Sequence, residues 1–349
     1  MTEILEVTGD GFERAVARAG LVLRRGGLVA FPTETVYGLG ANGLDADAVQ
    51  RIFIAKGRPA DNPLILHVES PAAAAAYVED MPPAAERLAA LFWPGPLTLV
   101  LPRSPRVPEI VSAGLPSLAV RVPAHPMALA LIRAAGVPVA APSANSSSRP
   151  SPTTAAHVLA DLGGRIDLIL DGGPTEVGLE STVLDLTGPS PRLLRPGGIT
   201  VEALAAALGE DGLELGGGDG ERPASPGMKY RHYAPRSPLT LVDGEPAAIR
   251  ALIASEMALA GRQGRTLAAL VYSESVPALH GLGLVLDLGP RDDPATACRR
   301  LFTLLRECDG AGVDGILAEA GDAKGLGLAV HNRLLKAAGG HVVRAGGGA

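Results

Sequence analysis

Short apolar runs that alternate with helical patterns constrain the fold of this chain more than any other feature. The apolar runs are of β type and are bounded by Pro, Gly or Asp. In chain order they read GGLVAF, PLILHV, LTLVLP, LAVRVP, VPVAAP, DLILDG and STVLDL. Apolar residues at helical spacing predict helices over residues 12–25, 71–79, 84–92, 126–135 and 153–162. Strands and helices mixed in this way predict an α/β fold with an open sheet.

A change of amino-acid composition near residue 205 predicts a second domain. The stretch GEDGLELGGGDGERPASPG is rich in Gly, Asp and Pro, which is typical of a linker. A second α/β pattern follows, with the strands PLTLVDG, TLAALVYS, GLVLDLG and GILAEA and helical patterns between them. We therefore expect a first domain over residues 1–208, a linker over 209–237 and a smaller C-terminal α/β domain over 238–349.

Composition and charge exclude several classes of protein. Hydrophobic residues make up 47% of the chain and charged ones 19%, which fits a soluble globular protein. The chain lacks an apolar run of the ~18 residues that cross a bilayer, and MTEILEVTGD lacks the features of a signal peptide, so a cytoplasmic location is expected. The net charge of −6 disfavours a protein that grips a long nucleic acid, but leaves room for a local basic pocket. Neither Cys298 nor Cys308 has metal-ligand spacing, the histidines are scattered, and no protein-built metal site is expected.

Four side chains that form hydrogen bonds follow the first strand, in the stretch FPTETVYGLG. The chain turns at Pro32 and then places Thr33, Glu34, Thr35 and Tyr37 before two glycines. So many polar groups after a buried strand need partners, either within the fold or in a ligand.

Cations and an amide follow the helix of DADAVQRIFIAKG, which has Asp45 as its expected N-cap and Gly57 just past its end. Lys56 and Arg58 lie at the C-terminal end of this helix, where they could simply complement its dipole. With Asn62 and the tight Gly- and Pro-containing loop, they also suit a polyphosphate.

Other polar residues stand at the ends of predicted strands. Ser143 and Asn145 follow VPVAAP, and Ser151 is the expected N-cap of the next helix, with Pro152 at its first position. This is either an anion site or a polar surface loop with a cap. His67, Arg121, Ser181 and Arg195 stand within or beside other strands. A buried structural ion pair would explain either arginine, and the whole set predicts a small anionic, phosphorylated ligand without naming a reaction.

Six motifs in order resemble one known family. PTETVYGLG, KGRPADNPL, WPGPLTLVL, APSAN, ESTVLDL and LRPGGI closely resemble the YrdC-like threonylcarbamoyl-AMP synthases over about residues 10–205. SPGMKYRHYAP, followed by a second α/β pattern, resembles the two-domain form of that family. The resemblance implies an open twisted mixed sheet with a concave cationic cleft, and a smaller Rossmann-like α/β domain after it.

The resemblance also implies an activity. Family members join L-threonine, bicarbonate and ATP, with Mg²⁺, into threonylcarbamoyl-adenylate and pyrophosphate. A separate transferase complex then carries the threonylcarbamoyl group to an adenosine next to the tRNA anticodon. The expected partners are therefore the three substrates and, transiently, that complex, with no stably bound nucleic acid and no membrane.

Site residues follow from matching the family motifs. Lys56 and Arg58 are the expected catalytic residues. The residues expected to bind ATP are Lys56, Arg58, Asn62, Ser117, Ser143, Asn145, Ser151, Arg195, Tyr230, His232 and Tyr233, the last three in a lid over the nucleotide. Those expected to bind threonine are Thr35, His67, Arg121, Ala141 and Ser181. Ser148 stands where the family is expected to have Gly, which leaves the conformation of that loop open.

Two other functions remain open at this point. YrdC-like domains also occur in carbamoyltransferases that use carbamoyl phosphate, but these carry additional metal-binding modules that the sequence lacks. A concave cationic face would also suit an RNA-binding module. The acidic net charge and the aromatic content of 3% argue against this function.

Overall fold

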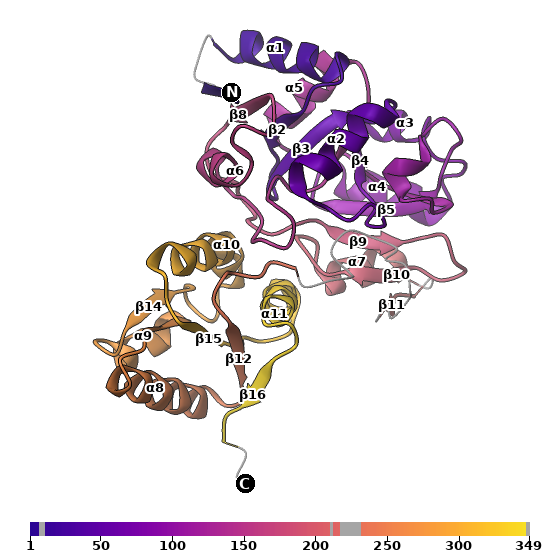
Figure 1. The fold of residues 1–349 in the computed structure, drawn as a ribbon. Helices are drawn as coiled ribbons and strands as arrows, with labels where there is room; N and C mark the ends of the chain where they lie inside the picture. Colours follow the sequence, from indigo (N-terminus) through magenta and orange to yellow (C-terminus); the bar gives the residue numbers. More distant parts are fainter. Residues whose placement is uncertain (7–10, 210–211, 217–231, 347–349) are drawn as a thin grey trace. The chain divides into compact units, whose positions relative to one another are not determined.

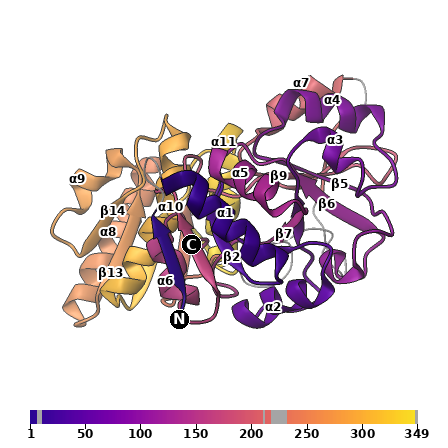
Figure 2. The ribbon, with the colours of Figure 1, turned by 90° about the horizontal axis from the view of Figure 1, so that it is seen from above.

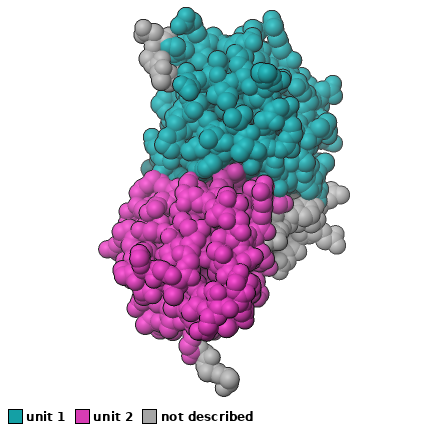
Figure 3. Space-filling model, turned by 60° about the vertical axis from the view of Figure 1, so that its left-hand side comes forward, with its two compact units in different colours: residues 1–147, 151–230 teal, residues 148–150, 231–349 magenta. Residues whose placement is uncertain are grey.

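The computed structural model describes residues 1–6, 11–209, 212–216 and 232–346. The chain divides into two compact units, which Figure 3 colours separately. Unit 1 comprises residues 1–147 and 151–230, and unit 2 comprises residues 148–150 and 231–349. Unit 2 therefore includes three residues that lie far from its other residues along the chain.

Unit 1 is built on a mixed sheet, which in the described residues has 11 strands in the order β1-β8-β2-β3-β7-β4-β6-β5-β9-β10-β11 (Figure 1). These strands are β1 (Glu3–Glu6), β2 (Val29–Pro32), β3 (Tyr37–Asn42), β4 (Ile65–His67), β5 (Leu97–Pro102), β6 (Ser117–Arg121), β7 (Val139–Ala141), β8 (Leu168–Asp171), β9 (Thr182–Asp185), β10 (Arg192–Arg195) and β11 (Glu214–Leu215). The expected open mixed sheet is thus confirmed. The β runs read from the sequence all contain a strand.

Helices cover both faces of this sheet. They are α1 (Phe12–Arg24), α2 (Ala46–Lys56), α3 (Pro71–Ala74), α4 (Pro83–Phe92), α5 (Pro126–Ala135), α6 (Ala155–Leu162) and α7 (Val201–Leu208), with a 3₁₀ turn at Glu109–Ser112. On one face α1 and α5 pack beside each other and bury Val29 and Phe31 of β2 (Figure 1). The alternate residue Ala30 joins a second core cluster that includes α2 and α4. Because both faces are covered, the strands are apolar almost throughout.

Strand β3 was not predicted, and its glycines explain why. Gly is depleted in strands, yet Gly38 and Gly40 both lie in β3. A Cβ at Gly40 would lie 2.7 Å from Val139 Cγ1 and 2.9 Å from Phe31 Cε1. Glycine is therefore required here by close packing against the neighbouring strands.

Two helix predictions were wrong in detail. The helix expected over residues 71–79 is only the short α3, which ends at Ala74. The N-cap of α6 is Thr154, whose hydroxyl accepts a hydrogen bond from His157 N, and not Ser151. The chain at 152–153 is still tied to unit 1 by backbone bonds from Tyr37 N to Pro152 O and from Thr175 N to Thr153 O, so the helix begins later than expected.

Unit 2 is a parallel sheet with helices between its strands. Its described strands β12 (Leu239–Asp243), β13 (Leu267–Val271), β14 (Leu284–Asp287), β15 (Gly315–Glu319) and β16 (Val342–Arg344) pair in the order β14-β13-β15-β12-β16. The connecting helices are α8 (Pro246–Arg262), α9 (Val276–Leu279), α10 (Pro294–Ala311) and α11 (Gly325–Ala337), with a 3₁₀ turn at Ser273–Ser275. Figure 2 shows β13 and β14 side by side next to α8. This confirms a second, smaller α/β fold of the Rossmann-like type.

Residues 148–150 are held by other residues of unit 2. Ala234 N donates to Ser148 O at 2.9 Å, and Arg306 Nη2 donates to Pro150 O at 2.6 Å. The Arg149 guanidinium forms an ion pair with Asp309 at 2.9 Å. Ser148 itself has a φ of 70°, in the left-handed region that favours glycine. The loop thus keeps a glycine-like conformation although it carries serine.

Replacing Ser148 with Gly is therefore expected to stabilise the protein by about 1 kcal/mol, because it removes the steric cost of a left-handed serine. The measurement is the free energy of unfolding in urea. Ser147→Gly is the matched control, since Ser147 is not among the described residues with positive φ. The control is expected to be neutral or destabilising. Equal effects of the two changes would contradict the explanation.

Among the helices of the described residues, none combines the length and the apolar character needed to span a membrane.

Candidate active site

Neighbouring strands bring together four of the five residues that are predicted to bind threonine. His67 at the end of β4 lies opposite Arg121 at the end of the parallel strand β6. Ala141 at the end of β7 lies opposite Ile65 of β4. The turn that carries Thr35 precedes β3, and β3 pairs with β7. Four segments far apart in the sequence thus meet in the middle of the sheet of unit 1.

The guanidinium of Arg121 lies at the centre of this group and is 3% exposed. Its Nε donates to Gly95 O at 3.1 Å, and its Nη1 donates to Thr35 Oγ1 at 3.0 Å. Its Nη2 lies 2.6 Å from Glu34 Oε1 in an ion pair. The sequence offered either a ligand or a structural ion pair for this arginine, and in the structure its charge is balanced by Glu34.

Glu34 was not predicted as a site residue. Its carboxylate is buried beside Arg121, which lies 87 positions away along the chain (121 − 34). A signal was present, because a buried arginine needs an anion and PTETVYGLG places an acidic residue in an apolar wall. Only the fold, however, selects Glu34 as the partner.

Hydrogen bonds of Thr33 close the turn between β2 and β3. Thr33 Oγ1 donates to Val36 O at 2.7 Å and accepts from the backbone N of Thr35 and Val36. Farther along, Tyr37 donates its hydroxyl proton to Gly173 O at 2.7 Å. Burial, with the charge of Asp171 nearby, raises the pKa of Tyr37 above its ordinary value, so this hydroxyl stays protonated. The turn is therefore rigid and presents Glu34 and Thr35 to Arg121.

His67 is buried and uncharged. Burial, reinforced by the positive charge of Arg121, lowers its pKa to about 3. Its Nδ1 lies 3.2 Å from the carbonyl oxygen of Ile65, and its ring meets Phe31 edge-on at 6.2 Å. A neutral imidazole at this position can exchange hydrogen bonds with a small polar ligand without adding positive charge beside Arg121.

The low pKa of His67 predicts a pH dependence of stability. Above about pH 6.5 the residue is neutral in both states, so its contribution is fully present. As the pH falls from about 6.5 towards 3, His67 binds a proton in the unfolded state but stays neutral in the folded state. Stability is then lost at up to about 1.4 kcal/mol per pH unit. His67→Asn is expected to reduce the slope of unfolding free energy between pH 6 and 4, whereas His280→Asn, at an exposed histidine, leaves it unchanged. Equal slopes in all three proteins would contradict this.

Ser181 and Arg195 link the two predicted substrate sites. Arg195 Nη2 donates to Ser181 O at 3.0 Å and to Ser181 Oγ at 3.3 Å. Ser181 Oγ also lies 2.7 Å from Thr98 Oγ1. A residue expected to bind threonine is thus in direct contact with one expected to bind ATP.

Lys56 is surrounded by backbone carbonyl groups of the predicted phosphate loop. The residue is 3% exposed, and its Nζ donates to Ser143 O and to Asn145 O. Ser143 Oγ in turn donates to Asn145 Oδ1 at 2.5 Å. The loop is tied further by bonds from Ser147 N to Lys56 O and from Ala144 N to Tyr37 O. Lys56 and the loop that carries Ser143 and Asn145 therefore form one cluster.

Arg58 and Asn62 form the neighbouring loop. Arg58 Nε donates to Asn62 O at 3.2 Å, and its Nη2 donates to Pro63 O at 2.9 Å. Asn62 is 1% exposed, and its Oδ1 has no hydrogen-bond partner among the residues that the structure describes. The guanidinium of Arg58 thus closes this loop on itself, and Asn62 presents a buried oxygen that a ligand could use.

The remaining predicted residues are less closely joined. Ser151 donates to Glu180 Oε1 at 2.5 Å. Ser117 begins β6 and so lies at the opposite end of that strand from Arg121. Tyr233 lies in unit 2, where its ring stacks on Phe302 at 5.4 Å. His232 contacts Tyr233, with 5.6 Å between ring centroids, and Tyr230 lies outside the described residues. The lid role of these three residues stays a prediction.

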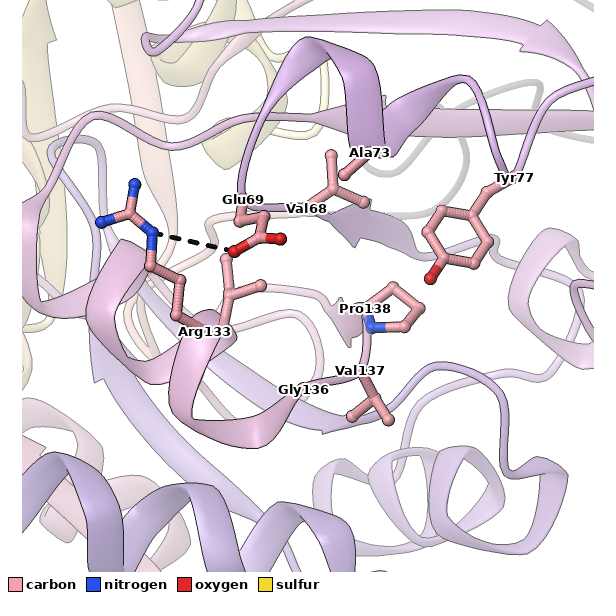
Figure 4. Close-up of a pocket in the computed structure, with 9 residues that line it drawn as sticks. Val68, Glu69, Ala73, Tyr77, Arg133, Gly136, Val137 and Pro138 are labelled. Atoms are coloured by element: carbon pink, nitrogen blue, oxygen red, sulfur yellow. Dashed lines mark ion pairs between the residues drawn. The ribbon is translucent and has the colours of Figure 1, made fainter.

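A small pocket elsewhere in unit 1 contains none of the predicted residues. It is lined by Val68, Glu69, Ala73, Tyr77, Ile132, Arg133, Gly136, Val137 and Pro138. Figure 4 shows Glu69 and Arg133 reaching across one end of it, where they form an ion pair at 3.7 Å. Both of these side chains are about half exposed, so this pocket is a surface feature and not the centre described above.

The chain thus combines a mixed α/β sheet, in which Lys56, Arg121 and Arg195 are buried cations, with a smaller parallel α/β unit. Residues 21–197 match the family model described as Telomere recombination, and residues 199–339 match the one described as Threonylcarbamoyl-AMP synthase, C-terminal domain. The threonylcarbamoyl-AMP synthase of Pyrococcus abyssi is 48% identical over 99% of this chain and 100% of its own length. That of Bacillus subtilis is also 48% identical, over 94% of both chains.

Solved structures agree with these matches. The crystal structure of P. abyssi Sua5 complexed with L-threonine superposes with a TM-score of 0.92, at 45% identity over 99% of both chains. Escherichia coli YciO covers 58% of this chain and 100% of its own, with a TM-score of 0.53 and 26% identity. The chain belongs to the threonylcarbamoyl-AMP synthase family, as its sequence motifs predicted.

Proposed function

We propose that this protein is a threonylcarbamoyl-AMP synthase, an adenylyl-transferring enzyme that joins L-threonine, bicarbonate and ATP. Its products would be threonylcarbamoyl-adenylate and pyrophosphate. Support comes from the relatives of that name at 48% identity and from the threonine complex of the P. abyssi protein. A transient transferase complex that modifies tRNA, and a cytoplasmic location, stay predictions from the sequence.

The observation that carries the proposal is the buried guanidinium of Arg121, which binds Thr35 and lies opposite His67. A planar guanidinium can donate two parallel hydrogen bonds to one carboxylate. We assign Arg121 to the threonine carboxylate. Thr35, His67, Ala141 and Ser181 form the rest of that pocket. The hydroxyls and the neutral imidazole would select the small polar side chain of threonine by hydrogen bonds.

The cluster around Lys56 is proposed to bind ATP. Lys56 and Arg58 would exchange their present carbonyl partners for phosphate oxygens, because charged partners give stronger hydrogen bonds than neutral ones. Ser143, Asn145 and Ser151 would donate to the phosphates, and Asn62, Ser117 and Arg195 would complete the nucleotide site. Tyr230, His232 and Tyr233 are proposed as the lid. Since Arg195 touches Ser181, the two substrates would lie next to each other.

Catalysis in this site would depend on positioning and charge neutralisation. A carbamate made from threonine and bicarbonate would direct one oxygen at the α-phosphorus, and pyrophosphate would leave against Lys56 and Arg58. Among the described residues, no group of three or more His, Cys, Asp or Glu could hold a metal. The proposed ATP site instead fits Mg²⁺ that enters bound to the triphosphate. The buried Asn62 Oδ1 would offer it one neutral oxygen ligand. When bound, Mg²⁺ would neutralise phosphate charge.

The test is pyrophosphate release from ATP by purified protein, with L-threonine and bicarbonate omitted in turn. Release that requires both, and that L-serine does not support, is expected. Release without threonine, or salt-sensitive binding to RNA with no threonine-dependent release, would contradict the proposal and favour the RNA-binding alternative. Release of phosphate from carbamoyl phosphate would favour the carbamoyltransferase alternative.

A further inference from the structure

Glu34 carries a buried carboxylate for which the proposed substrate sites give no role. The residue is 5% exposed. Arg121 Nη2 lies 2.6 Å from Oε1 and supplies the counter-charge, whereas Oε2 has no hydrogen-bond partner among the described residues. A buried carboxylate oxygen without a hydrogen bond is unfavourable, so such a group in a folded protein calls for an explanation.

The fold holds the backbone of Glu34 in place from both sides. Thr33 closes the turn on one side through its bonds to Thr35 and Val36. Glu34 O accepts a hydrogen bond from Val177 N at 2.8 Å, which ties the turn to the loop before β9. The side chain is thus fixed beside Arg121 by a rigid turn, as residues that bind a ligand commonly are.

The Arg121–Glu34 pair matches the charges of an amino acid. An α-amino acid presents a carboxylate and an ammonium group on one carbon, so it needs a positive and a negative partner side by side. We propose that Glu34 binds the α-ammonium group of the amino-acid substrate and accepts its proton, while Arg121 binds the carboxylate. This inference rests on the proposed function and adds a catalytic residue to the amino-acid site.

The proton transfer balances the first step of that reaction. The ammonium group gives one proton to the Glu34 carboxylate and becomes a neutral amine. The amine lone pair attacks the carbon of bicarbonate, so a C–N bond forms and the C–OH bond breaks. The leaving hydroxide takes a second proton from nitrogen and departs as water, and the carbamate remains. Without an acceptor, the ammonium would have no lone pair for this attack.

The other ionisable groups near Glu34 do not replace it. Arg121 is a permanent cation. Burial lowers the pKa of His125, at the N-cap of α5, although the charges of Glu34 and Glu176 act in the opposite direction. His67, beyond Arg121, stays neutral because its pKa is about 3. Neither imidazole therefore changes charge in a pH range above 7, where the test is made.

The first measurement is the pH dependence of kcat/KM for threonine between pH 7 and 9, at a fixed bicarbonate concentration. With Glu34 as acceptor no proton is lost to solvent, so log kcat/KM of the wild type is expected to be flat. In Glu34→Gln the substrate must enter as free amine. Its kcat/KM is then expected to fall by at least about 100-fold at pH 7 and to rise about tenfold per pH unit. Glu176→Gln removes an exposed carboxylate nearby and is expected to behave like the wild type.

The second measurement is calorimetric binding, which does not depend on turnover. The probe is the α-hydroxy analogue of threonine, which lacks the ammonium group. Wild type is expected to prefer threonine by at least about 100-fold, and Glu34→Gln to reduce this preference to less than about 10-fold. Glu34→Asp, which keeps the charge, is expected to retain the preference in part, even if Glu34→Gln folds poorly.

The outcomes separate the two proposals. If the wild type prefers threonine and Glu34→Gln loses that preference, but the wild type releases no pyrophosphate, the proposed function fails and ammonium recognition by Glu34 stands. If Glu34→Gln releases pyrophosphate with a flat pH profile and an unchanged preference for threonine, the proposed function stands. Glu34 would then only neutralise Arg121, and this inference would be overturned.

Discussion

Arg121→Ala is expected to abolish measurable threonine binding and to lower the free energy of unfolding by roughly 3–5 kcal/mol. The stability loss arises because the variant leaves the carboxylate of Glu34 buried without its counter-charge. It also leaves Thr35 Oγ1 and Gly95 O without their donor. Urea unfolding and calorimetry with L-threonine measure the two effects.

The double variant Glu34→Gln/Arg121→Met separates stability from binding. Replacing both partners removes the unpaired charge, so most of the lost stability is expected to return. Threonine binding should not return, since the carboxylate site is absent. A loss of less than about 1 kcal/mol in Arg121→Ala would be typical of an ordinary surface substitution. That result would contradict the expected contribution of the ion pair to the free energy of unfolding.

Lys56→Met is expected to lower threonine-dependent pyrophosphate release by 100- to 1,000-fold, the range found when one preorganised donor is removed. The ammonium group of Lys56 holds the carbonyls of Ser143 and Asn145 together, and it is the proposed phosphate ligand. Threonine binding should change by less than about 3-fold, because the threonine carboxylate is assigned to Arg121 and the phosphates to Lys56.

Lys324→Met is the matched control for this change. Lys324 is exposed at the start of α11 in unit 2 and is assigned to neither substrate site. Its replacement is expected to leave pyrophosphate release unchanged. Activity in Lys56→Met close to that of the control would remove Lys56 from the catalytic set.

Features set by neighbouring residues were predictable from the sequence. Helix α2 has the expected N-cap at Asp45, whose side chain accepts from Asp47 N and Ala48 N, and its C-cap is Gly57 at φ 61°. These signals act within a few residues, so they are visible in the chain itself. The alternation of strands and helices likewise gave the open sheet, because apolar periodicity reports burial directly.

Features set by distant residues were not predictable in the same way. The glycines of β3 argued against a strand, and their reason is the approach of Val139 and Phe31. Ser151 had the sequence context of a helix cap, but its hydroxyl donates to Glu180 instead. Glu34 became a candidate only when Arg121 was placed beside it by the sheet. In each case the deciding partner lies outside the local window, where propensity is overridden by packing.

The mass of the nucleotide product formed with isotope-labelled bicarbonate distinguishes activation of the carbamate from activation of threonine itself. The wild-type protein, incubated with ATP, Mg²⁺ and L-threonine, is expected to form one adenylate that contains both threonine and the labelled carbon. That result would join all three substrates in one site. An adenylate of threonine that forms without the labelled carbon would contradict the account, because the protein would then activate the amino acid itself and not its carbamate.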